Sequence, residues 1–186
     1  MNEILFTVPG FLVGSECTEL ITATEARGFE AAPITTSRGF VMMPELRNNT
    51  RVMLDDVALA RRLYEKLEPH LPAIRGWRPT GLNERFRFYR YDEGESFTWH
   101  RDGAYRRENG EESLLTFMIY LNEGFAGGQT EFEGAAVRPR TGLALVFTHR
   151  MRHQGAAVTR GRKYALRSDV MFTREMPASI DGASRL

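Results

Sequence analysis

Residues 147–169, FTHRMRHQGAAVTRGRKYALRSD, contain the pattern that decides the fold. An apolar run ends at Phe147, and a loop with His149 and His153 follows it. A new β-like run begins near Gly155, and a tight turn at residues 160–162 leads into the final run. Short β runs joined by tight turns are typical of a small antiparallel β domain.

The final run, residues 163–173, alternates in a way that predicts two different faces. Lys163, Ala165, Arg167 and Asp169 fall on one face, while mainly apolar side chains fall on the other. A charged face in a small β domain either meets solvent or lines a polar pocket. The histidines one run earlier favour the pocket.

The rest of the chain extends the same architecture. A strand is expected at 4–8, followed by a helix that Ser15 caps and that runs to about residue 27. Asp55 and Asp56 open a second helix to about residue 68, and residues 33–51 are expected to form a loop without regular structure. After Gly76, further short strands are expected at 84–91, 114–121, 130–132, 135–138, 143–147, 155–159 and 164–173.

The predicted fold class is therefore mainly β with flanking helices (α+β), a β-barrel or jelly roll packed by N-terminal helices. We expect a single domain over residues 1–186. It would comprise a helical flank of about 1–76, a β core of about 77–174 and a loose C-terminal tail from about Glu175.

Composition excludes several classes of function. Of 186 residues, 42% are hydrophobic and 26% charged, and 25 basic residues against 24 acidic ones leave a formal charge of +1. No field of one sign dominates, so neither nucleic acid nor a membrane surface is expected as a partner. Cys17 is the one cysteine and the N-terminus lacks a signal-peptide pattern, so we expect a cytoplasmic protein without disulfides.

The candidate chemistry starts with His100-x-Asp102. On an extended segment, residues two apart point to the same face. A second histidine beside them would give two imidazoles and one carboxylate on one face of a metal ion, the arrangement of non-haem Fe(II) oxygenases. Taken alone, the pair is ambiguous: it also suits a loop histidine bonded to a nearby aspartate, or a zinc or manganese enzyme for hydrolysis or isomerisation. His149 and His153 compete for the third position.

Four stretches together narrow the choice: YRYDEGESFTWHRD (89–102), LLTFMIYLNEGFAGGQTEF (114–132), VRPRTGLALVF (137–147) and HQGAAVTRGRKYALRSD (153–169). In this order they resemble the Fe(II)- and 2-oxoglutarate-dependent dioxygenases, specifically the prolyl 4-hydroxylase-like branch. The resemblance covers about residues 84–173 and implies a double-stranded β-helix, or jelly roll, as the core.

The resemblance assigns roles residue by residue. His100, Asp102 and His153 match the iron ligands, with His153 preferred because Lys163 follows it at the family spacing. Lys163 matches the cation for the far carboxylate of 2-oxoglutarate. Tyr91 and, less closely, Tyr120 match positions that contact the cosubstrate, although both also suit aromatic packing. Arg167 is a hypothesis for the near carboxylate or an acidic substrate, with a salt bridge to Asp169 or another acid as the alternative. Gln154 departs from the family, which often has glutamate there.

The implied activity is hydroxylation of a C–H bond in a peptidyl, including prolyl, or small-molecule substrate, with release of succinate and CO2. The implied cofactors are Fe(II), 2-oxoglutarate and O2, and ascorbate is expected to stimulate. Asp102 favours hydroxylation over halogenation, because related halogenases lack this carboxylate. The alternative is a non-catalytic metal- and 2-oxoglutarate-binding sensor or scaffold of the same fold. Residues 33–51 and 103–112, rich in arginine, are expected to flank the opening of the site.

Overall fold

The structure, a computed structural model, describes residues 3–36 and 39–175. The helices are α1 (Gly14–Glu25), α2 (Val57–Leu67) and the 3-10 turn η1 (Glu68–His70). The strands are β1 (Leu5–Val8), β2 (Glu30–Ala31), β3 (Ile34–Thr36), β4 (Gly39–Val41), β5 (Thr50–Asp55), β6 (Trp77–Leu82), β7 (Arg85–Tyr91), β8 (Phe97–His100), β9 (Glu112–Tyr120), β10 (Ala126–Gly127), β11 (Thr130–Phe132), β12 (Ala135–Val137), β13 (Ala144–Thr148), β14 (His153–Gly155), β15 (Val158–Arg160) and β16 (Lys163–Arg174).

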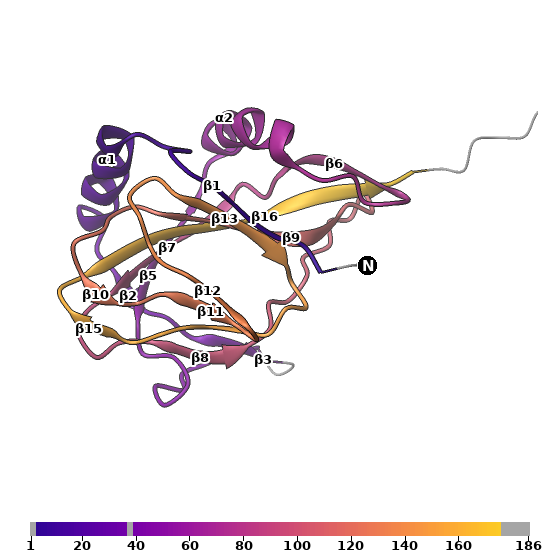
Figure 1. Cartoon of the computed structure of the whole chain (residues 1–186). Helices are drawn as coiled ribbons and strands as arrows, with labels where there is room; N and C mark the ends of the chain where they lie inside the picture. Colours follow the sequence, from indigo (N-terminus) through magenta and orange to yellow (C-terminus); the bar gives the residue numbers. More distant parts are fainter. Residues whose placement is uncertain (1–2, 37–38, 176–186) are drawn as a thin grey trace, which may run out of the picture.

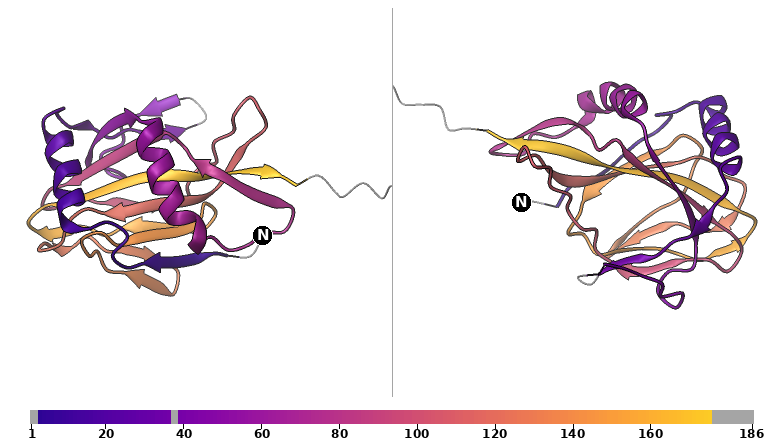
Figure 2. Two further views of the ribbon diagram at one scale, coloured as in Figure 1. Left: turned by 90° about the horizontal axis from the view of Figure 1, so that it is seen from above. Right: turned by 180° about the vertical axis from the view of Figure 1, so that it is seen from behind.

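Two antiparallel sheets form the body of the protein. The large sheet has eight strands in the order β1-β13-β9-β16-β7-β5-β2, with β6 paired to β16. The small sheet has the order β12-β11-β14-β8. Figure 1 shows the small sheet below the large one and both helices above it, and Figure 2 shows α1 and α2 crossing the outer face of the large sheet. This arrangement confirms the prediction of a mainly β jelly roll with helices packed on one side.

Strict alternation divides the large sheet into two faces. On β9, Leu115, Phe117 and Ile119 are fully buried toward the helices. Leu63 and Leu67 of α2 pack in the same cluster, because apolar residues at helical spacing give that helix one apolar side. Full burial of each such side chain stabilises the fold by about 1.5–3 kcal/mol. The opposite faces of the strands point toward the small sheet and remain available for polar groups.

The strand β16 connects the two halves of the large sheet. It pairs with β7, where Lys163 lies opposite Tyr91, and with β9, where Ala165 lies opposite Tyr120. This register brings Lys163, Tyr91 and Tyr120 to one end of the inner face, although they come from segments far apart in the sequence. The charged face predicted for residues 163–169 therefore points inward.

The N-terminal part contains more strand than the sequence indicated. The strand expected at 4–8 is present as β1, and β2 and β5, which were not predicted, also belong to the large sheet, so the first 76 residues supply strands as well as the two helices. The prediction of an irregular loop over 33–51 is wrong in part, because β3 and β4 form a hairpin there and β5 begins at Thr50. The strands β6 and β8 were also not predicted. Their partners lie in distant segments, and their own sequences show no clear alternation.

The helix ends follow local hydrogen bonding. Asp56 caps α2 as predicted, accepting a hydrogen bond from the Leu59 N–H at 2.9 Å. The predicted cap Ser15 is wrong, because α1 begins at Gly14 after Val13. There the Glu16 carboxylate accepts the Val13 N–H at 3.0 Å, so an acidic side chain in the first turn replaces the hydroxyl cap. The predicted tail lies outside the described residues, except for Glu175.

No helix in the part of the chain that the structure describes is long and apolar enough to cross a membrane.

Gly142 provides a test of this packing. It has φ +75°, and an added Cβ would lie 1.9 Å from the Leu12 carbonyl oxygen, so both conformation and space require glycine. We expect Gly142→Ala to lower the free energy of unfolding by about 3 kcal/mol or more. Gly134→Ala is the matched control, since Gly134 has φ +86° but no atom near its Cβ position, and it should cost only about 1 kcal/mol. Equal losses in chemical denaturation would contradict the close approach of Leu12.

Candidate metal and 2-oxoglutarate site

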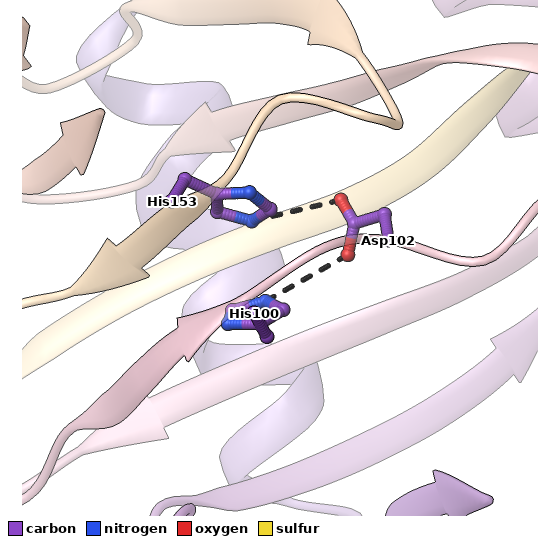
Figure 3. A group of neighbouring side chains, drawn as sticks. All are labelled: His100, Asp102 and His153. Atoms are coloured by element: carbon purple, nitrogen blue, oxygen red, sulfur yellow. Dashed lines mark ion pairs between the residues drawn. The ribbon is translucent and has the colours of Figure 1, made fainter. Parts of the chain in front are cut away.

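Two paired strands bring the candidate metal ligands together. His100 ends β8, His153 begins β14, and the two residues lie directly opposite each other in the small sheet. Asp102 follows β8 by two residues, and its backbone N–H donates to the His149 carbonyl at 3.0 Å, which holds the segment against the loop after β13. Figure 3 shows both imidazoles directed at the Asp102 carboxylate.

The spacing of the three side chains suits a single metal ion. His100 Nε2 lies 3.8 Å from Asp102 Oδ1, and His153 Nε2 lies 3.7 Å from Asp102 Oδ2. All ligand atoms of the group lie within 4.8 Å of one another. An ion about 2 Å from each ligand atom bridges such gaps. Two imidazoles and one carboxylate are also the donor set that Fe(II) takes in enzymes which leave adjacent coordination positions open.

Backbone carbonyls fix the orientation of both imidazoles. His100 Nδ1 lies 2.7 Å from the Thr98 oxygen and His153 Nδ1 lies 2.9 Å from the Met151 oxygen. Because a carbonyl only accepts, each Nδ1 carries the proton and each Nε2 is free to ligate. Burial, with the neighbouring imidazole second, lowers the pKa of His100 to about 4, and burial likewise lowers the pKa of His153. Both rings are therefore neutral near pH 7, as metal binding requires.

Asp102 is held as a carboxylate. Burial alone would raise its pKa, but the charge of Arg167 and the neighbouring polar groups outweigh burial, so its pKa lies below the ordinary value. Arg167 Nη2 lies 3.0 Å from Oδ1, and the Thr116 hydroxyl donates to Oδ2 at 2.5 Å. Each carboxylate oxygen thus has its own donor, which fixes the plane of the group.

His149 lies outside the cluster and supports it through Thr116. The Thr116 hydroxyl gives its one proton to Asp102, so it accepts from His149 Nδ1 at 2.9 Å. His149 Nε2 then accepts from the Ser113 hydroxyl at 2.9 Å, and the Ser113 oxygen accepts the Tyr105 N–H at 2.8 Å. All four hydrogen bonds therefore run in one direction, from the Tyr105 N–H to the Asp102 carboxylate. The structure therefore places His153 in the triad, whereas His149 contacts the Asp102 carboxylate only through Thr116.

Lys163 lies at the far end of a narrow cavity that the triad also lines. Its side chain is 2% exposed, Nζ donates to the Gly128 carbonyl at 2.7 Å, and the rings of Tyr91 and Tyr120 lie 4.8 and 5.5 Å from it. No carboxylate among the described residues forms an ion pair with it, and burial lowers its pKa to about 7. A buried ammonium without an anion is a site for a carboxylate from a ligand.

The two tyrosines differ in how their hydroxyls are used. Tyr120 is fully buried and its hydroxyl donates to Thr130 Oγ1 at 2.6 Å. Tyr91 lines the cavity and is also buried, and burial raises the pKa of both phenols. Both therefore stay protonated near neutral pH and can contribute an aromatic wall beside Lys163.

Arg167 satisfies parts of both hypotheses made for it. It lines the cavity and contacts Asp102, and its Nη2 also lies 3.4 Å from Asp169 Oδ1. The salt bridge to Asp169 is therefore present, and Asp102 is a second carboxylate partner. Thr116 also lines the cavity, and its bond to the Asp102 carboxylate is visible only in the fold.

The arginines of the two segments expected to flank the opening differ in burial and in ion pairing. Arg47, from 33–51, is buried beside the site, at 6% exposure. In 103–112, Arg106 pairs with Glu112, and Arg107 pairs with Glu111 and Glu84. These two arginines have partners within the protein, so the segment's charge does not by itself mark a binding surface.

The geometry so far defines a jelly-roll protein with a site for one metal ion and one buried anion. Residues 86–168 match the family model described as the 2OG-Fe(II) oxygenase superfamily. This match confirms the resemblance to that superfamily and the predicted use of Fe(II) and 2-oxoglutarate. No curated protein sequence matches the chain.

Several solved structures share the fold. A viral collagen prolyl hydroxylase from Paramecium Bursaria Chlorella virus-1, in a 2OG complex, is 21% identical with a TM-score of 0.60, covering 90% of this chain and 95% of that one. A Pseudomonas putida prolyl-4-hydroxylase is 19% identical with a TM-score of 0.64, covering 92% of each chain. A Trichoplax adhaerens prolyl hydroxylase, in complex with a hypoxia inducible factor peptide fragment, is 17% identical with a TM-score of 0.65, covering 89% of this chain and 82% of that one.

Metal affinity tests the division of roles between the histidines. We expect His153→Ala to abolish Fe(II) binding, because it removes a ligand. Thr116→Val should weaken binding by about 10–100-fold, since it removes the donor that orients Asp102. His149→Ala should retain binding, weakened no more than in Thr116→Val. Anaerobic Fe(II) titration provides the measurement, and wild-type affinity in His153→Ala would contradict the assignment.

The pH dependence of 2-oxoglutarate binding tests Lys163. The ammonium must be protonated to bind a carboxylate, and its pKa in the free protein is about 7. Affinity should therefore be full below that pKa and fall as pH rises through it, with the Kd increasing about tenfold per pH unit above it. Lys163→Arg is the control, because a guanidinium stays charged and should remove this dependence. A 2-oxoglutarate affinity that does not change with pH in the wild-type Fe(II)-loaded protein would contradict the role assigned to Lys163.

Proposed function

We propose that this protein is an Fe(II)- and 2-oxoglutarate-dependent hydroxylase that inserts oxygen into a C–H bond and releases succinate and CO2. The observation that carries the proposal is that one cavity is lined by the whole triad and by Lys163, a buried ammonium that forms no ion pair within the described residues. A dicarboxylate bound to a metal through one end needs such a cation for its other end.

Each residue of the site would have a role that follows from its position. His100, Asp102 and His153 would hold Fe(II), which when bound supplies the oxidising chemistry. Lys163 would bind the far carboxylate of 2-oxoglutarate and so orient the cosubstrate along the cavity. Apolar walls, including Phe147, would exclude water from this space. The carboxylate of Asp102 supports hydroxylation, since it takes the position that a halide would need.

The substrate is proposed to be a peptide, including a prolyl peptide, or a small molecule. The fold is shared with prolyl hydroxylases, one of which is in complex with a peptide fragment. A cleft of about 400 Å³ opens beside His100 and Asp102, on the side of the hairpin formed by β3 and β4. A cleft of this size is suited to a side chain or a small molecule. We also propose a cytoplasmic location, and stimulation by ascorbate remains a prediction.

Succinate formation tests the proposal. The protein loaded with Fe(II) should convert 2-oxoglutarate to succinate in air, faster with a substrate than without one. Asp102→Ala should lose this turnover by several orders of magnitude, because it removes both a ligand and its charge. Arg61→Gln is the control, since Arg61 is 82% exposed on α2 and remote from the site.

Three results would contradict a hydroxylase. Succinate release unchanged in Asp102→Ala would exclude the triad as the reaction centre. Tight binding of metal and 2-oxoglutarate without any succinate, across a broad panel of peptides and metabolites, would favour the sensor or scaffold alternative. Zinc or manganese as the metal retained after purification, without an Fe(II)–2-oxoglutarate charge-transfer band, would favour a hydrolase or isomerase.

A further inference from the structure

Two hollows meet at His100 and Asp102, which line both of them. The narrow cavity is also lined by Lys163, while the cleft of about 400 Å³ is lined by residues of other segments, among them Ile34 and Leu46. Both are lined by Phe97, His100, Asp102 and Arg167, and only the cleft is lined by Arg47. If the cavity holds the cosubstrate, the cleft is where another molecule can approach the same metal. Arg47 is therefore placed to contact a substrate.

The guanidinium of Arg47 is fixed between two aromatic rings. Its Cζ lies 4.7 Å from the centre of the Tyr89 ring and 4.5 Å from that of Phe97. Arg47 Nε donates to Asn49 Oδ1 at 2.8 Å, which fixes the remaining rotation. Stacking of this kind leaves the edge of the guanidinium, with its fork of N–H donors, free to bind a planar anion.

One end of that fork has no acceptor. Arg47 Nη2 is buried and has no hydrogen-bond partner in the part of the chain that the structure describes. The aromatic faces stabilise the positive charge but do not accept these N–H groups in the plane of the guanidinium. A buried donor without an acceptor is costly, so native proteins satisfy it with a side chain, water or ligand.

Arg47 also differs from the neighbouring arginines in its ion pairing. Arg87 pairs with Asp169 at 3.3 Å and Arg167 pairs with Asp102 at 3.0 Å. Within the described residues, Arg47 has no carboxylate partner, so the wall around Tyr89 carries an excess of positive charge. Burial raises the pKa of Tyr89, but the nearby guanidinium groups outweigh burial and leave the pKa below its ordinary value.

We infer that the substrate carries a carboxylate that Arg47 binds at the inner edge of the cleft. This inference rests on the proposed function and adds the chemical class of its substrate. The carboxylate would anchor the substrate on the protein while another part of the molecule faces the metal. The same group can come from a free amino acid, from the C-terminus of a peptide or from an acidic side chain within a peptide.

Matched acid and amide probes test the inference without turnover. The full chain is loaded with Mn(II) in place of Fe(II) and saturated with 2-oxoglutarate, which occupies Lys163. Probe binding is read from the relaxation that Mn(II) causes in probe protons, so only molecules near the metal respond. The panel comprises the L-amino acids and their amides, short peptides with free or amidated C-termini, and doubly capped peptides with Asp or Asn.

We expect members of one acid class to bind about tenfold or more tightly than their amides, as a charge-assisted hydrogen bond predicts. Arg47→Gln should remove this preference, and Arg47→Lys should restore part of it because the charge returns without the fork. Arg61→Gln, which changes net charge equally on the outer face, should leave it intact. The class that shows the preference identifies the source of the carboxylate.

Two outcomes would overturn the inference: no preference for acids over amides anywhere in the panel, or a preference that persists in Arg47→Gln. Failure of the proposed function is distinguished by a separate measurement. If Mn(II) or 2-oxoglutarate does not bind at all, the proposed function fails at the first step. If both bind and the acids show no advantage, only the carboxylate inference fails.

Discussion

The pairing of β14 with β8 is the contact on which the site depends. It places His153 opposite His100, although they are separated by more than a quarter of the chain. Their side chains share a face of the small sheet, and Asp102 closes the group because the chain continues past β8 for two residues before it bonds to the His149 carbonyl. A shift of one residue in this register would turn one imidazole to the other face and dissolve the triad.

Buried charge explains much of what surrounds the triad. Asp102 is kept ionised by Arg167 and Thr116, while His100 and His153 are kept neutral by burial. A carboxylate and two neutral imidazoles are the protonation states that a divalent metal requires. The groups behind them, such as the chain from Ser113 through His149 to Thr116, have few alternative hydrogen bonds, so they hold the carboxylate in one orientation.

In the part of the chain that the structure describes, two buried cations at the site form no ion pair with a carboxylate of the protein. Lys163 lies at the end of the narrow cavity and Arg47 lies at the cleft. The lysine has a single carbonyl partner between aromatic rings, and the arginine is stacked with one nitrogen unpartnered. Such groups are costly unless a ligand brings the missing charge. The two positions therefore support the proposal of two ligands at one metal, the cosubstrate beside Lys163 and a substrate beside Arg47.

The sequence by itself determined the mainly β architecture, the His100-x-Asp102 pair and the inward face of residues 163–169, because each depends on local alternation or spacing. It also placed most strands of the core within a residue or two. It could not decide between His149 and His153 from residue types alone, and it placed Arg47 in an arginine-rich loop at the opening of the site without showing which of those arginines lines the cleft. The identity of the third ligand depends on pairing between distant strands, and the state of Arg47 depends on which arginines form ion pairs with a carboxylate. Tertiary structure decides such contacts, because burial and charge pairing arise only when segments far apart in the chain meet.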